Sequence, residues 1–232
     1  MQKIMFDNRF DLTRAVLDGI KTMTRRLVPP IPPVMKIAGD GALEFYLATQ
    51  LEVRNGVLFT YHDGCEGWRI APAQCQPRYK IGEVVAVAQS YLSIHEEMMD
   101  DSFGEGYCDA IYDSFRWATV YNKPGWENKM FVRADLMPHQ IRITDIRVER
   151  IQDISDEDCM KEGVEKGYIG YYINGLKTKD WEKESHVEKD GNTYKLFPTP
   201  REAFAALINK ISGKGTWESN PWEFVYEFEL VK

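Results

Sequence analysis

Six consecutive residues near the N-terminus bring together the side chains that a site for an anionic or carbonyl-bearing ligand requires. The run KTMTRR begins at Lys21, adds the hydroxyls of Thr22 and Thr24, and ends with the guanidinium groups of Arg25 and Arg26. Arginine supplies a fixed positive charge with a forked set of donors, and a hydroxyl beside a base is a candidate nucleophile. A lysine serves as that base only if its pKa, ordinarily about 10.4, is lowered by burial or by neighbouring cations.

The elements that must position this run follow from apolar periodicity. Apolar residues recur at helical spacing over residues 11–18, with Asp11 as the N-cap and Gly19 just beyond the end. A strand is expected to start at about Thr22. Because neighbouring strand residues point to opposite faces, Lys21 and Thr24 can converge only if the backbone bends between them.

Alternating and apolar runs predict several more strands. Asn55-Gly56 lies between two such runs and is typical of a β-hairpin with a type I′ turn. Further strands are expected at residues 84–88, 130–134 and 139–150, the last with a break at Thr144-Asp145. At residues 222–230, aromatic side chains alternate with glutamates, which predicts a half-buried strand with one aromatic face.

Two capping boxes predict helix starts in the C-terminal third. Ser155 begins a short helix that ends near residue 162, and Thr199 begins a second helix, which Gly213 ends. The polar stretch 166–197 between them is expected to be an insertion with a weak hairpin. Many strands with three short helices indicate a mostly β (α+β) fold, built as a closed or nearly closed barrel that carries insertions.

Composition and charge limit the partners that this chain can have. The 232 residues carry a net charge of −7, and nucleic-acid affinity depends mainly on neutralising phosphates, so no extended duplex DNA is expected as a partner. A local basic pocket for a small ligand or a short single strand is compatible with that charge. The sequence contains no apolar run of membrane-spanning length, so no membrane partner is expected.

Four scattered cysteines, Cys65, Cys75, Cys108 and Cys159, form no CxxC pair. Free thiols in a reducing cytoplasm are therefore expected. A zinc site made by His62, Cys65 and Cys75 is an alternative, but the sequence offers no evident fourth ligand. We accordingly predict neither a metal nor a cofactor.

The lysine–threonine–arginine run resembles the GxKTxTxR signature of the ASCH domain, a small β-barrel related to the PUA fold. Other segments resemble the larger, often phage- or prophage-associated branch of that superfamily in the same order along the chain, at residues 79–83, 151–163, 200–204 and 213–228. Together the matches cover about half the chain. The resemblance implies one ASCH-type domain over residues 1–232, a PUA-like barrel with short flanking helices and insertions at about 29–78, 93–129 and 166–197.

The resemblance also implies a groove for RNA or a modified nucleoside. Some small bacterial members hydrolyse the amide of N(4)-acetylcytidine with a lysine, a threonine and a glutamate, which fall on Lys21, Thr24 and Glu162. Thr24 would then attack the acyl carbon, Lys21 would accept its proton, and Glu162 would protonate the leaving nitrogen. Substrate binding would fall to three neighbouring residues, Thr22, Arg25 and Arg26.

Other interpretations of the same residues stay open. Lys21 is equally suited to contact a phosphate or carboxylate, or to stand as a cation at a helix C-terminus. The terminal aromatic residues form either a platform for stacked bases or one face of the core. At the level of function, the alternatives are a non-catalytic RNA- or nucleotide-binding module and a phage-derived interaction protein. The sequence leaves the oligomeric state open.

Overall fold

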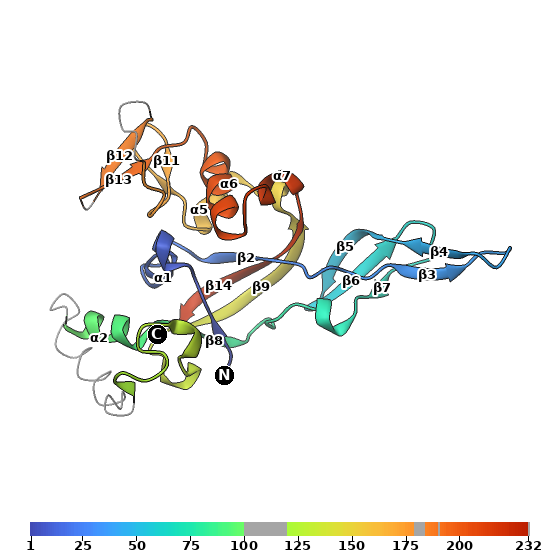
Figure 1. Cartoon of the computed structure of the whole chain (residues 1–232), viewed down its shortest axis with the longest axis horizontal. Helices are drawn as coiled ribbons and strands as arrows, with labels where there is room; N and C mark the ends of the chain where they lie inside the picture. The colour runs from blue at the N-terminus through green and yellow to red at the C-terminus, as the bar shows by residue number, and fades with distance from the viewer. Residues whose placement is uncertain (100–119, 179–183, 190, 232) are drawn as a thin grey trace.

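A computed structural model describes residues 1–99, 120–178, 184–189 and 191–231 (Figure 1). Strand accounts for 34% of the structure and helix for 25%, which confirms the expected strand-rich α+β class. The described parts of the chain comprise a central sheet, helices packed beside it, and smaller sheets at the periphery.

The central sheet has five strands in the order β1-β8-β9-β14-β2. They are β1 (Lys3–Ile4), β8 (Val84–Val87), β9 (Gln140–Arg150), β14 (Trp222–Val231) and β2 (Met23–Leu27). In the part of this sheet that the structure describes, only the β1–β8 pair is parallel. Among the described strands β1 and β2 are the two ends of this order, and no pairing joins them. The two long strands, β9 and β14, form the centre of the sheet.

A β-bulge interrupts the pairing of β9 with β14. Ile143 pairs with Phe228 and Asp145 with Glu227, so Thr144 is an extra residue on β9. Because of this extra residue, the apolar side chains before it and those after it point to the same face of the sheet. The break predicted from the interrupted alternation of this strand is therefore confirmed.

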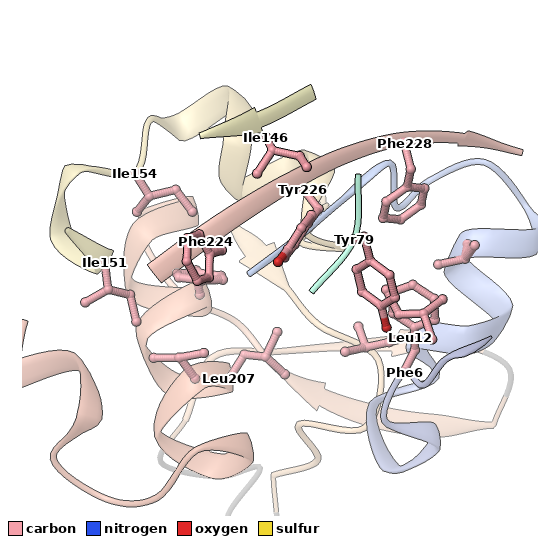
Figure 2. Packing of buried hydrophobic residues seen from close by; sticks show 14 of the residues in the cluster. Phe6, Leu12, Tyr79, Ile146, Ile151, Ile154, Leu207, Phe224, Tyr226 and Phe228 are labelled. Carbon is pink, nitrogen blue, oxygen red and sulfur yellow. The ribbon is translucent and has the colours of Figure 1, made fainter. Parts of the chain in front are cut away.

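The main hydrophobic core lies against one face of β14 (Figure 2). Phe224, Tyr226 and Phe228 are all buried in it, together with Leu207 and Phe6. The ring of Phe6 lies 5.8 Å from that of Phe228. Of the two interpretations of the terminal aromatic residues, the core face is thus confirmed for these three.

The described residues contain five α-helices, where the sequence predicts three: α1 (Leu12–Leu17), α2 (Tyr91–Met99), α5 (Asp156–Lys161), α6 (Pro200–Ile211) and α7 (Thr216–Ser219). The predicted helices are α1, α5 and α6, which begin close to where the sequence places them, whereas α2 and α7 were not expected. Ser155 and Thr199 cap α5 and α6 by accepting hydrogen bonds from Asp158 and Glu202. Asp11 precedes α1 in a left-handed conformation, with φ 54°, and its side chain makes no capping hydrogen bond. The α1 boundary was therefore predicted correctly, but not its cap.

Peripheral sheets occupy two of the three expected insertions. The first contains β3 (Val34–Ile37), β4 (Leu43–Tyr46), β5 (Ala48–Arg54), β6 (Val57–His62) and β7 (Arg69–Ile70). The second contains β10 (Glu165–Lys166), β11 (Tyr171–Tyr172), β12 (His186–Lys189) and β13 (Asn192–Lys195). Asn55 and Gly56 have φ values of 49° and 75°, which is the left-handed pair that the predicted type I′ hairpin needs. The third insertion contains α2, and its residues 100–119 lie outside the described chain.

The strand predicted at 130–134 is wrong. Short 3-10 helices, η4 (Lys129–Phe131) and η5 (Ala134–Leu136), take its place. The side chain of Asn128 accepts a hydrogen bond from Met130 N at 2.9 Å, which closes a turn. Such local side-chain bonds compete with strand pairing. The other 3-10 turns of the described residues are η1 (Asn8–Phe10), η2 (Ala73–Cys75) and η6 (Ile151–Asp153).

Gly175 gives a stringent test of how the second insertion packs on the N-terminal segment. Its φ is +85°, and a Cβ there would overlap the carbonyl oxygen of Arg9 and lie 2.8 Å from Phe10 Cα. We expect Gly175→Ala to lower the free energy of unfolding by at least about 3 kcal/mol, through backbone strain and overpacking together. Denaturant unfolding measures this loss.

Gly191→Ala is the matched control. Gly191 has a similar φ of +71°, but a Cβ would meet nothing within 4 Å. It should cost only the conformational strain of about 1 kcal/mol. Equal losses in the two variants would contradict the close approach of Gly175 to Arg9.

Candidate functional site

The turn after α1 places Lys21 ahead of β2 rather than within it. Gly19 adopts φ +73°, and the amide of Lys21 then donates to the Ala15 carbonyl at 2.9 Å. Since β2 begins only at Met23, strand alternation does not separate Lys21 from Thr24. This turn provides the bend that the sequence requires, and both side chains line the same pocket.

Lys21 and Glu162 form a buried ion pair. The ammonium group of Lys21 contacts the Glu162 carboxylate and also donates to its backbone carbonyl at 2.9 Å. Glu162 is the C-cap of α5, so the end of that helix sets its position. Only 2% of Lys21 and 4% of Glu162 is exposed. Burial lowers the pKa of Lys21, which the Glu162 charge opposes and the nearby guanidinium groups of Arg25 and Arg26 reinforce.

Arg25 lies beneath this pair among four acidic side chains. Its guanidinium contacts Glu149 and lies 3.1 Å from Glu162, 3.6 Å from Asp158 and 3.9 Å from Glu223. These partners come from β9, the end of α5, α5 itself and β14. Arg25 therefore ties β2 to three other elements. Its charge is engaged by protein groups, although it also lines the pocket where substrate binding was predicted.

Thr24 is held by the guanidinium of Arg26. One Arg26 nitrogen donates to Thr24 Oγ1 and to the Arg25 carbonyl, each at 2.8 Å. The other terminal nitrogen donates to the Met5 carbonyl at 2.8 Å. Because Arg26 is the donor to Thr24, the threonine keeps its own hydroxyl proton free to donate. A cationic donor on Oγ1 would also stabilise negative charge developing on that oxygen.

These side chains surround a pocket of about 820 Å³ beside β2. Five of the six predicted site residues line it, namely Lys21, Thr24, Arg25, Arg26 and Glu162. One wall is apolar and comes from α6, with Phe204, Leu207, Ile208 and Ile211. Residues 5–9 and 127–129 also line the pocket. Thr22 is not among the lining residues, and its backbone hydrogen bonds to Lys161 and Phe228.

Glu223 is a pocket residue that the sequence analysis missed. The alternation of β14 predicts that this glutamate faces solvent, but only 1% of it is exposed. Its Oε2 has no hydrogen-bond partner among the described residues. Burial, reinforced by the charge of Glu162 and opposed by Arg25, raises the pKa of Glu223 to about 8. The signal in the sequence was Val225, an apolar residue on the same face of the strand, which indicates that this face is covered.

The zinc alternative has no geometric support in the described part of the chain. No group of three or more His, Cys, Asp or Glu side chains there is placed to hold a metal ion. His62 Nδ1 lies 2.9 Å from the Tyr46 carbonyl and Nε2 lies 3.1 Å from Thr60 Oγ1. Cys65, Cys75 and Cys159 are buried free thiols, as predicted, and Cys108 lies outside the described residues.

Comparison with known proteins yields no relative: no family model, curated protein or solved structure matches this chain. In the described residues, no helix has both the length and the apolar character that crossing a bilayer demands. The functional interpretation therefore depends on the pocket itself. That pocket combines a buried lysine–glutamate pair, a threonine hydroxyl held by an arginine, and an apolar wall from α6.

The raised pKa of Glu223 predicts a pH-dependent stability. Folded Glu223 keeps its proton up to about pH 8, whereas the unfolded carboxyl releases it near 4.5. The folded state therefore binds more protons between these values, and its stability falls as pH rises through that window. Between about pH 5 and pH 8 the free energy of unfolding of the wild-type protein should fall. That of Glu223→Gln should fall less, and the two falls should differ by on the order of a few kcal/mol.

Urea unfolding at a series of pH values measures this difference. Glu188→Gln is the matched control, because Glu188 is an exposed strand residue. Its stability should follow the wild-type curve. If the Glu223→Gln curve also runs parallel to the wild type, Glu223 does not hold a proton in the folded protein.

Proposed function

We propose that this chain is an ASCH-type protein whose pocket binds RNA or a modified nucleoside and hydrolyses the amide of an N(4)-acetylcytidine-like substrate. One observation carries the proposal: Lys21, Thr24 and Glu162 line one pocket, with the lysine and glutamate in a buried contact. The free thiols fit the cytoplasmic location that we propose with it.

The protonation states available to the Lys21–Glu162 pair suit amide hydrolysis. The reaction needs a neutral lysine as base and a protonated glutamate as acid. Transfer of one proton from Lys21 to Glu162 produces both without changing the net charge of the pair. Burial favours this neutral arrangement, because it lowers the pKa of Lys21. Arg25 contacts the other carboxylate oxygen of Glu162, at 3.1 Å.

The proposed reaction has two stages. Thr24 Oγ attacks the acyl carbon as its proton passes to Lys21, and Glu162 protonates the exocyclic nitrogen as the C–N bond breaks. Cytidine leaves and the acyl group remains on Thr24 as an ester. The proton that Lys21 took up then passes to Glu162, which restores the neutral lysine and the carboxylic acid. Water attacks the ester with Lys21 as base, and Glu162 protonates Thr24 Oγ as the C–O bond breaks, which releases the acid and restores the hydroxyl. The donor from Arg26 to Thr24 would stabilise the attacking oxygen.

We also propose that the central sheet is the open form of a PUA-like barrel. Arg26 of β2 donates to the carbonyl of Met5, the residue that directly follows β1. The two ends of the strand order therefore lie within reach of one side chain. This contact supports the barrel interpretation, and it puts the pocket at the gap between the two end strands.

A non-catalytic nucleotide-binding module is the second candidate. It is favoured by Glu162, which accepts from both Lys21 and Arg25, as expected of charges that are paired for structure. The pocket also carries Arg9, Arg26 and Lys129, which could contact phosphates. This alternative predicts salt-dependent RNA affinity without turnover.

Release of cytidine from N(4)-acetylcytidine, followed by chromatography, tests the hydrolase directly. Thr24→Val removes the hydroxyl with little change of shape and should lower the rate by a factor of at least about 10². Thr24→Ser keeps a nucleophile and should retain turnover. Lys21→Met and Glu162→Gln should also be inactive, but each leaves a buried partner unpaired, so the Thr24 variants are the cleaner comparison.

Thr49→Ala, an exposed threonine remote in sequence from the run, is the control and should match the wild type. Absence of turnover by the wild-type protein would contradict the hydrolase. Salt-dependent RNA binding in that same preparation would then favour the binding module.

A further inference from the structure

The β3–β4 hairpin carries an apolar surface that the rest of the described chain leaves uncovered. Its outward side chains are Met35, Ile37, Leu43 and Phe45, and Leu47 continues the row beyond β4. Met35 pairs with Phe45 and Ile37 with Leu43, so all four stand on one face of the hairpin. Each of the five is between 56% and 73% exposed. We call these five residues the apolar arm face.

The opposite face of the hairpin is attached to its own chain. Lys36 donates to the Gly64 carbonyl at 2.6 Å, and its ammonium group lies 5.5 Å from the centroid of the Tyr46 ring. A Cβ on Gly64 would collide with that ring, so the loop and Tyr46 are in close contact. The hairpin cannot simply turn over to bury its apolar side. The apolar arm face is therefore a fixed outward surface.

The arm is also placed so that a large partner can reach it. In Figure 1 the β3–β4 hairpin extends away from the central sheet and forms one end of the long axis of the molecule. Two copies could overlap their arms while their central sheets stay far apart. A two-stranded hairpin without further packing is at best marginally stable in water, so a covering layer would stabilise it.

Area and charge both favour a second copy of this chain as the cover. Large apolar side chains each offer about 150–200 Å² when free, so these five expose about 500 Å² and two copies would bury about 1,000 Å², near the lower limit for a specific interface. The face carries no charged side chain, so two copies meet without repulsion. The hairpin turn contains Asp40 and the chain has net charge −7, which disfavours an anionic membrane.

We propose that this protein self-associates through its arms, with the apolar arm face of one copy packed against that of a second. The two faces are identical, so the contact is two-fold and closes as a dimer. Interfaces at the low end of the size range are typically weak and transient, so the dimer should depend on protein concentration.

Sedimentation velocity over a concentration series of the full chain tests this proposal. The wild-type protein should shift from monomer to dimer as concentration rises. In Ile37→Glu/Phe45→Glu, two like charges would meet across the contact, and self-association should weaken at least about 100-fold. The same holds for Ile37→Lys/Phe45→Lys. A mixture of the two variants should recover the dimer, which also shows that the arms of both are folded.

Ile169→Glu is the matched control, because Ile169 is 69% exposed but lies between β10 and β11. It should dimerise as the wild type does. Three results would overturn the proposal: a wild-type protein that stays monomeric throughout, a dimer that survives both arm substitutions, or a mixture that remains monomeric. The first would leave a different partner as the cover of this face.

Discussion

The burial of two cations, Lys21 and Arg25, is the constraint on which the rest of this structure depends. Removing either from water costs several kcal/mol, and only well-placed carboxylates offset that cost. Glu162 faces both cations, while Glu149 contacts Arg25 from β9. The end of α5, the start of β2 and the centre of the sheet must therefore meet at one point. Such pairs add little net stability, but they penalise any arrangement that separates the partners.

The pocket has two kinds of surface, one polar and one apolar. Charged and hydroxyl groups gather at β2 and the end of α5, while α6 presents an apolar wall. Phe204 contributes to both surfaces. The centroid of its ring lies 5.7 Å from the Arg25 guanidinium, and the side chain also belongs to the main core. A ligand with an apolar body and a polar edge matches this arrangement, and the nucleobase that we propose as its occupant is of that kind.

Local signals predicted the elements well, and long-range contacts explain what was missed. The caps at Ser155 and Thr199, the Asn55 turn and the break near Thr144 all act within a few residues, so the sequence contains them. Lys21, Thr24 and Glu162 came from a family resemblance, and their shared pocket is a property of the fold. The burial of Glu223 depends on neighbours from β2 and β9, which alternation along β14 does not reveal.

The strand order has a consequence for biosynthesis. In the sheet β2 lies beside β14, so residues 23–27 can form their strand pairing only after residues 222–231 have been synthesised. Until then the nascent chain carries two cations whose partners, at positions 149, 162 and 223, are made much later. Long-range closures of this kind are slow. The pocket therefore cannot be complete before β14 is made, and a chain truncated before residue 222 would lack the strand that pairs with β2.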